Sequence, residues 1–544
     1  MAKTNSSLVI FTFLFSLFSW GSSDYIDNPT KFIRCLVVKS PESESATVGK
    51  LIYTPNNSSY ISVYEFSMRN PRFNTSTRLK PSVIVTPESE SQVQNVVICA
   101  KMYDMQIRVR SGGHDFEGLS YSSTYEIPFV LLDMINYKKV TVNATAKTAI
   151  VQAGATLGEV YYWIYRASNT LAFPAGVWST VGATGLICGG GYGPLRRMYG
   201  LAADNVLDVR MVDVKGRILD RESMGEDLFW ALRGGGCSSF GVILSWKLNL
   251  VDVPEKVTAL SMFRTLEQGA TDILYPFQTV AAKLPNEVDI RIRVNTTLSD
   301  LSPRADKKTA VLAFTGLYLG GADDFLAIMD EMFPQMGVVR EDLQEVSWIQ
   351  AIMSSSFFDL FEDTYSPEDL LDRTFLYDLS TKAKSDFVRQ PMSVAAINGL
   401  WDKLLEVEVG ETTVIFTPYG GVLDNYAESA LPFPNRAGTL FMLYERVLWV
   451  GNTTQKLEWI RSLSDYLTPY VSSNPRRAYW NYDDLDLGVN NDQGSIGYVE
   501  ARKWGRSYFN KNFEKLVMVK TMVDPDNFFR HEQSIPPFSL WSDM

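Results

Sequence analysis

The residues with the clearest chemical potential are two glycines followed by a histidine, Arg110-Ser-Gly-Gly-His114, after a predicted strand. The glycines let the backbone approach a ligand closely, and the successive N–H groups of such a turn converge on an anion. His114 is one of two histidines in the chain, the other being His531. An ordinary turn residue is the competing interpretation of His114. The motif favours a phosphate-containing ligand with a histidine anchor beside it.

Two further glycine clusters lie at 188–193 and 233–241. Neither matches the Gly-X-Gly-X-X-Gly dinucleotide fingerprint in its strand-turn-helix context, nor a Walker loop. Three such turns in one region indicate a large, flat, extended cofactor better than they indicate packing alone. Two histidines leave little room for metal chemistry, so no metal site is expected. A serine hydrolase is disfavoured because no Gly-X-Ser-X-Gly elbow is present.

The elements that must position these turns change in character near Pro254. Before it, short β-branched strands alternate with helices and glycine turns; after it, longer strands alternate with acidic helices. The predicted strands are 82–86, 106–110, 149–152, 242–246, 287–294, 309–314 and 412–417, and the predicted helices are 88–103, 322–333 and about 501–519. The pattern predicts an α+β protein whose second part is an antiparallel sheet backed by helices.

Length and charge narrow the functional classes. The 544 residues predict two or three domains, and the net charge of −11 argues against nucleic-acid binding. Residues 1–23 are typical of a secretory signal peptide, and no stretch is expected to span a membrane. We therefore expect a secreted protein, extracellular or vacuolar. Asn-X-Ser/Thr sequons at Asn56, Asn57, Asn74, Asn143, Asn295 and Asn452 are candidate glycosylation sites.

Four cysteines fit that compartment. We expect a disulfide between Cys35 and Cys99, which would tie the N-terminal segment to the following domain. Cys188 and Cys237 sit within the two glycine clusters. We interpret both as buried small residues rather than as a redox pair.

A series of motifs resembles the plant berberine bridge enzyme-like family, which includes the cannabinoid synthases. It comprises Arg110–His114, Gly154–Gly158, Gly189–Gly193, Tyr199–Asn205, Gly225–Ala231, Asn481–Asp486, Asp524–Phe529 and Gln533–Pro536, and so spans nearly the whole chain. The resemblance implies a bipartite FAD-binding domain of the vanillyl-alcohol-oxidase type, with an inserted antiparallel-sheet substrate domain. The expected boundaries are 24–254 for the first FAD-binding part, 255–475 for the substrate domain and 476–544 for the returning C-terminal segment.

The resemblance also implies which residues hold FAD. His114 would carry a covalent bond to the flavin, and the backbone of Ser111, Gly112 and Gly113 would bind the pyrophosphate. The other implied cofactor residues are Arg110, Trp178, Val181, Gly182, Gly185, Tyr192, Gly193, Val242 and Asn481.

The sequence departs from that family at two positions. Trp178 stands where typical members have a second flavin-linked cysteine, so a single link through His114 is expected. Met442 stands where the oxidases have a glutamate base, and a thioether cannot accept a proton. Glu445 would point to the opposite face of a regular strand. Tyr482 matches the tyrosine base of the cannabinoid synthases.

Two arginines occupy positions where relatives have other residues, Arg293 and Arg446. They could polarise a substrate carbonyl, or pair with Asp289 or Glu445. With Tyr482 they predict an intermolecular [4+2] cyclase, like the flavoprotein Diels–Alderases of plant phenolic metabolism. Its substrates would be a chalcone-type dienophile and a prenylated phenolic diene, and the protein is expected to be a monomer.

Two alternatives remain open. One is an FAD-linked oxidase, with Tyr482 as base, Val181 beside the oxygen approach and O2 as the electron acceptor. The other is a flavin-bearing binding protein without turnover.

Overall fold

The computed structural model describes residues 27–41, 48–357, 365–374, 379–451, 453–490 and 497–538. The predicted signal peptide and the sequon at Asn452 lie outside these ranges. Within them, no helix is both long and apolar enough to cross a membrane. Most buried apolar side chains belong to two large cores, one built mainly by residues 32–253 and 478–535 and the other by residues 260–467.

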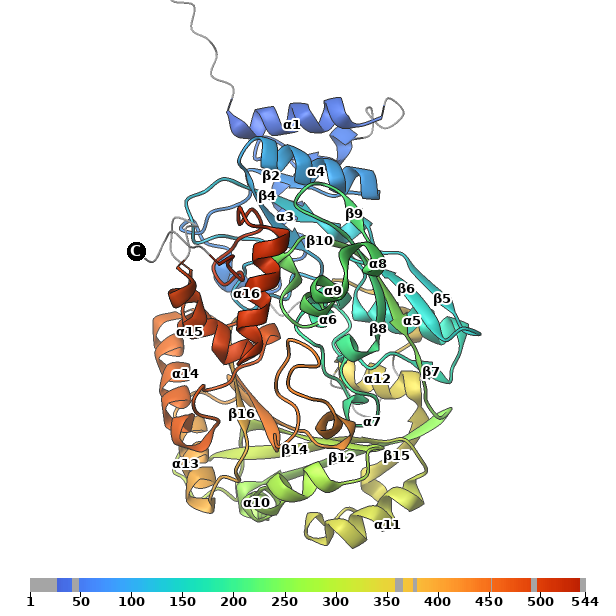
Figure 1. Ribbon diagram of the computed structural model, residues 1–544. Coiled ribbons are helices and arrows are strands. Elements are labelled where there is room, and N and C mark those ends of the chain that lie inside the picture. The colour runs from blue at the N-terminus through green and yellow to red at the C-terminus, as the bar shows by residue number, and fades with distance from the viewer. Residues whose placement is uncertain are drawn as a thin grey trace, which may run out of the picture.

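The first core is formed around two sheets (Figure 1). A four-stranded sheet has the order β1 (Ile52–Tyr53), β2 (Val83–Val85), β4 (Phe129–Asp133), β3 (Gln106–Arg110), with β2, β4 and β3 parallel. An antiparallel five-stranded sheet has the order β5 (Val140–Asn143), β6 (Thr148–Gln152), β10 (Val242–Asn249), β8 (Val206–Val212), β9 (Ile218–Leu219). β7 (Leu171–Ala172) pairs with β11 (Val251–Asp252).

Helices complete this part of the molecule. They are α1 (Asn28–Lys39), α3 (Tyr60–Phe66), α4 (Glu90–Met102), α5 (Leu157–Ala167), α6 (Ala183–Cys188), α7 (Arg196–Tyr199), α8 (Arg221–Met224) and α9 (Glu226–Leu232). The apolar spacing that predicts α4 is its buried face, and the Ser89 hydroxyl caps its first turn. β3 then ends at Arg110, so the glycine turn begins at the carboxyl edge of a parallel pair.

The second core lies against a seven-stranded sheet, antiparallel throughout, which confirms the predicted architecture. Its order is β15 (Leu343–Ser347), β12 (Lys256–Thr265), β14 (Lys308–Tyr318), β13 (Val288–Leu298), β17 (Thr412–Pro418), β18 (Phe441–Trp449), β16 (Ser380–Val388). Apolar residues of α10 (Ala270–Val280), α11 (Ala322–Met332), α13 (Val394–Leu404) and α14 (Thr453–Leu467) cover one face. In Figure 1, α10 and α11 lie below this sheet and the first core lies above it.

β13 shows how strand alternation divides the two faces of this sheet. Ile290, Ile292 and Val294 are fully buried in the helix-covered core. Arg291 and Arg293 alternate with them and are only partly buried. The arginines therefore point to the face that meets the first core. Helix α12 (Trp348–Phe357) follows β15 and packs into the first core.

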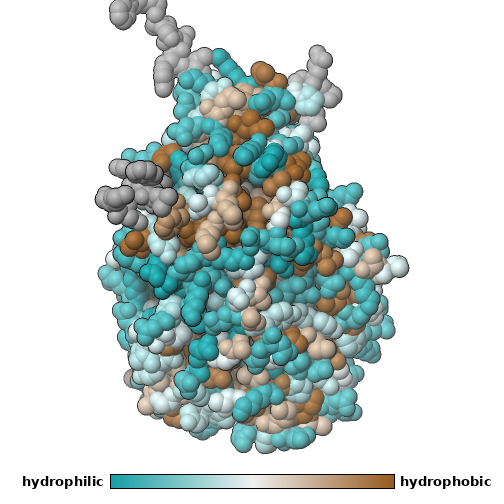
Figure 2. Space-filling model, viewed as in Figure 1, coloured by the Kyte–Doolittle hydropathy of each residue, from teal (hydrophilic) through white to brown (hydrophobic). Residues whose placement is uncertain are grey.

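The C-terminal segment returns to the first core through α15 (Tyr498–Phe509) and α16 (Asn512–Val523). The prediction of one helix over about 501–519 was wrong. Asn510 ends α15 with φ of 49°, a positive value that a continuous right-handed helix does not contain. On the face shown in Figure 2, apolar side chains gather in the upper part, while hydrophilic side chains dominate lower down.

Candidate cofactor and substrate site

A cavity of about 490 Å³ lies between the glycine turns and the uncovered face of the seven-stranded sheet. Three parts of the fold contribute to its wall. The first core supplies residues 107–120 and 176–192, the sheet supplies side chains of β13, β17 and β18, and the C-terminal segment supplies residues 479–483. The site therefore depends on segments far apart in the sequence.

The Ser111–His114 turn has no room for larger residues. A Cβ atom on Gly112 would lie 2.2 Å from the Gly182 nitrogen, and one on Gly113 would lie 1.7 Å from the Ser67 oxygen. Gly113 also has φ of +70°, which disfavours any side chain. Among the described residues, the N–H groups of Gly112, Gly113 and His114 have no acceptor. This arrangement fits the pyrophosphate of a dinucleotide.

His114 lies in the cavity wall beside Trp178. Nε2 of His114 is 2.8 Å from Oγ1 of Thr180, and the Trp178 indole donates to the same oxygen over 3.1 Å. Burial, helped by the Arg69 charge, lowers the pKa of His114 to about 3. The ring is therefore neutral at pH 7, which is the form that can bond to carbon through a ring nitrogen.

Ten of the thirteen expected cofactor residues line this cavity: Ser111, Gly112, Gly113, His114, Trp178, Val181, Gly182, Gly185, Tyr192 and Asn481. The other three do not. Arg110 is buried and pairs with Asp133 at 2.6 Å; Gly193 packs against the Ala175 carbonyl; Val242 is buried in β10. These three support the walls of the site from behind.

Arg293 and Arg446 line the cavity together with Tyr482. The register of β13, β17 and β18 places the two arginines on the same face of the sheet. Paired residues form two rows across these strands, Arg293–Ile415–Tyr444 and Asn295–Thr413–Arg446. Arg446 donates to Oγ1 of Thr413 over 3.4 Å, and its buried Nε has no hydrogen-bond partner among the described residues. Asn295 shares this face and its Oδ1 is buried, which argues against a glycan there.

The two carboxylates that the sequence suggested as partners for these arginines, Asp289 and Glu445, are placed elsewhere. Asp289 pairs with Arg196 at 2.7 Å. Glu445 points to the opposite face of β18, as the alternation predicts, and neither of its oxygens has a hydrogen-bond partner within the described chain. Met442, at the position of the missing base, is fully buried against Phe387 and its neighbours and does not line the cavity.

An aromatic cluster forms another part of the wall. Ring centroids are 4.5 Å apart for Tyr444 and Tyr482, 5.5 Å for Phe116 and Tyr482, and 6.0 Å for Phe116 and Tyr444. The Tyr482 hydroxyl is hydrogen-bonded to that of Tyr192. Burial raises the pKa of Tyr444 to about 12 and that of Tyr482 well above its usual value. Both side chains are neutral phenols, suited to contact aromatic rings and donate hydrogen bonds.

Two carboxyl groups in the wall, Asp115 and Asp483, were missed at the sequence level. Their side chains lie close enough for the charge of one to act on the other. Burial raises the pKa of both, and repulsion from Asp115 and Glu117 raises that of Asp483 further. Because like charges held close together oppose ionisation, the raised pKa of Asp483 favours its protonated form.

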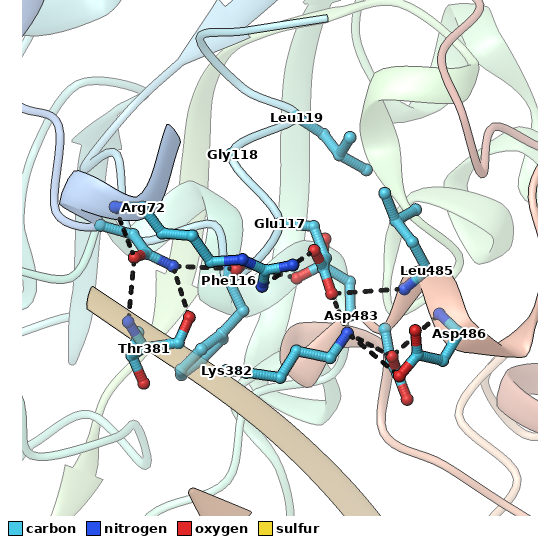
Figure 3. Close-up of polar contacts among 12 residues, drawn as sticks. Arg72, Phe116, Glu117, Gly118, Leu119, Thr381, Lys382, Asp483, Leu485 and Asp486 are labelled. Atoms are coloured by element: carbon cyan, nitrogen blue, oxygen red, sulfur yellow. Dashed lines mark hydrogen bonds and ion pairs between the residues drawn. The ribbon is translucent and has the colours of Figure 1, made fainter. Parts of the chain in front are cut away.

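A buried ion network holds this part of the site (Figure 3). Lys382 of β16 binds Glu117, and also Asp484 at 2.5 Å; Lys384 binds Asp484 at 2.7 Å. Glu117 follows the His114 turn, and Asp484 follows Tyr482. The network therefore connects the Ser111–His114 turn, the edge strand β16 and the C-terminal segment.

The two glycine clusters are also joined covalently. The interpretation of Cys188 and Cys237 as unpaired was wrong, because they form a disulfide, and both residues line the cavity. Backbone turns 49 residues apart bring the sulfurs together, and nothing in the local sequence signals this. The predicted Cys35–Cys99 disulfide is present and joins α1 to α4.

Comparison with known proteins places this geometry in a family. Residues 81–221 match the family model of the FAD binding domain, and residues 478–536 match the model named "Berberine and berberine like". The chain is 44% identical to berberine bridge enzyme-like 8 of Arabidopsis thaliana, covering 97% of this chain and 99% of that protein. The chain belongs to the berberine bridge enzyme-like family.

Its relatives include oxidases. Tetrahydroberberine oxidase of Berberis wilsoniae is 44% identical over 99% of this chain and all of that protein. Among solved structures, Arabidopsis berberine bridge enzyme-like 28 superposes with a TM-score of 0.85 at 42% identity, covering 94% of this chain and 100% of the other. A variant of berberine bridge enzyme itself superposes with a TM-score of 0.86 at 34% identity, covering 93% and 100%. The chain is thus an FAD-binding enzyme of an oxidoreductase family.

Proposed function

We propose that this protein is an FAD-dependent intermolecular [4+2] cyclase that joins a chalcone-type dienophile to a prenylated phenolic diene. The observation that carries the proposal is the replacement of a base by cations. Arg293 and Arg446 line one cavity with Tyr482, while Met442 occupies the base position and is buried outside it. A guanidinium takes no proton, but it donates to a carbonyl and withdraws electron density from an enone.

Holding the two substrates in a reactive orientation lowers the activation barrier of the cycloaddition further. A cavity that holds diene and dienophile together can contribute roughly 7–11 kcal/mol, and one well-placed donor about 3–4 kcal/mol. The Phe116, Tyr444 and Tyr482 rings offer aromatic contacts to planar substrates.

The cofactor attachment is part of the proposal. His114 would hold FAD through a single covalent bond, and Trp178 would replace the second bond with packing. When bound, FAD supplies an oxidised ring system that is able to accept a hydride. In the proposed reaction it shapes the cavity and accepts no hydride. Support comes from the neutral His114 ring and from the shared Thr180 contact.

Export through the secretory pathway is proposed as well. The two disulfides are those of an oxidising compartment. The sequon residues Asn56, Asn57, Asn74 and Asn143 are exposed and accessible to glycosylation.

The second candidate function is an FAD-linked oxidase, favoured by the oxidases among the relatives. It requires a proton acceptor beside the cofactor. Tyr482 is the available tyrosine, but burial and its bond to Tyr192 favour the neutral phenol. Burial and the neighbouring carboxyls raise the pKa of Asp483, which favours its protonated form. The wall therefore offers donors more readily than a strong base.

An anaerobic titration separates the two functions. The protein is mixed with a prenylated-phenol diene and a chalcone while flavin absorbance and product mass are followed. The cyclase produces a mass equal to the sum of both substrates at unchanged flavin absorbance. Flavin bleaching with loss of two hydrogens from one substrate would establish the oxidase. Neither change would indicate a binding protein. Arg293→Gln should lower adduct formation with flavin content unchanged.

A further inference from the structure

A third arginine, Arg291, occupies a distinct place in the cavity wall. It lies on β13 two residues before Arg293 and shares its face, about 7 Å away along the strand. It lines both the main cavity and a second, smaller one of about 30 Å³. Arg291 is therefore a lining residue that the two spaces have in common.

The surroundings of Arg291 are polar but poor in negative charge. Asp289, the carboxylate nearest in sequence on its strand face, is bound to Arg196. The residue opposite on β14 is Thr315. Among the residues described, Arg291 forms no ion pair, and Asp289 is the one carboxylate that lines the smaller cavity. The guanidinium thus has donors available for a ligand.

The smaller cavity is a hydrogen-bonding corner. Gln344, Ser354 and Ser355 line it, and the buried Oε1 of Gln344 has no hydrogen-bond partner within the described chain. Its volume is about that needed for one water molecule or one ligand oxygen with its hydrogen. An oxygen bound in this corner would lie beside Arg291, which lines it.

The charge balance of the main cavity points in the same direction. Arg291, Arg293 and Arg446 come from two strands of one sheet face. Asp115 and Asp483 are the carboxyl-bearing residues of its described lining, and burial raises the pKa of both. An anionic ligand beside Arg291 would be attracted by these guanidinium groups.

We propose that Arg291, which lines both cavities, is a specificity-determining residue that binds an ionised oxygen of the substrate, a carboxylate or phenolate. This rests on the proposed function only in using the same substrate site. Arg293 and Arg446 act on the reacting carbonyl, whereas Arg291 selects an acidic aromatic substrate by its remote end. Bidentate binding of a carboxylate is the geometry that a guanidinium favours.

Binding of two anions and their uncharged methyl derivatives to the flavin-loaded protein tests this assignment. The first pair is 4-coumarate and its methyl ester at pH 7; the second is 4-nitrophenolate and 4-nitroanisole at about pH 8.5. Calorimetry on wild type should show tighter binding of the anion in at least one pair, by about tenfold to a hundredfold. Arg291→Gln should remove most of that preference, and Arg291→Lys should keep part of it.

A surface variant controls for the loss of charge. Arg304→Gln removes the same charge from an exposed residue paired with Asp306 in the same domain, and should leave the preference intact. Flavin content and melting temperature establish that each variant is folded. An unchanged preference in Arg291→Gln, or the absence of any preference in wild type, would overturn the proposal. Either result would leave the adduct-mass test of the cyclase unaffected.

Discussion

Removing the Cys188–Cys237 disulfide should destabilise the protein and disturb the cofactor cavity together. The bond closes a loop with a sequence separation of 49. In the chain-entropy account, a crosslink of that span stabilises the folded state by about 4 kcal/mol at 25 °C. The double variant Cys188→Ala/Cys237→Ala should lose about that much, measured by denaturant unfolding without reductant.

The second disulfide provides a matched control. Cys35–Cys99 has a sequence separation of 64, so the same account again assigns about 4 kcal/mol. It joins α1 to α4 and neither cysteine lines the cavity. Cys35→Ala/Cys99→Ala should therefore lose similar stability with the flavin absorbance spectrum unchanged. The cavity variant should shift that spectrum or reduce flavin content.

Two results would refute this reasoning. One is thiol labelling of the denatured, unreduced wild type that finds two free thiols, because it would mean that Cys188 and Cys237 are not bonded. The other is a cavity variant with wild-type stability and spectrum.

Further predictions concern single residues. His114→Ala should abolish acid-stable flavin, and yellow protein after acid precipitation would contradict the link. Arg446→Gln should slow adduct formation about 10²–10³-fold at equal flavin content; an unchanged rate would exclude its role. Lys382→Met should cost about 3–5 kcal/mol of unfolding free energy by leaving buried carboxylates unpaired. Arg461 is half-exposed, so Arg461→Met should lower the unfolding free energy by less than about 1 kcal/mol. Equal losses in the Lys382 and Arg461 variants would argue against the buried network. Burial lowers the pKa of His531 to about 3, below its unfolded value of about 6.5. The free energy of unfolding should therefore decrease as the pH is lowered from about 6.5 to about 3, by up to about 1.4 kcal/mol per pH unit. Denaturant titrations of His531→Asn should show a weaker dependence on pH.

Features set by local pattern could be predicted from the sequence. Period-two alternation places Arg293 and Arg446 on one face and Glu445 on the other, because β13 and β18 are regular. The glycine turn at 112–113 is equally local, since close packing there excludes a Cβ. The same alternation would have identified Arg291.

Features set by the approach of distant segments could not be predicted in this way. The Cys188–Cys237 bond and the Asp115–Asp483 pair each join turns that meet only in the folded chain. The break at Asn510 is a different case, in which one residue with positive φ overrides a continuous helical pattern. Neighbouring tertiary contacts, rather than helical propensity, decide where such a chain turns.

The most direct test of the central claim is the number of adduct molecules formed per flavin without oxygen. A cyclase needs no electron acceptor, so many turnovers per flavin should accumulate anaerobically while the flavin stays oxidised. A reaction that depends on flavin reduction stops after one turnover until O2 is admitted. Continued anaerobic turnover is the result we predict, and arrest after one equivalent would contradict the account.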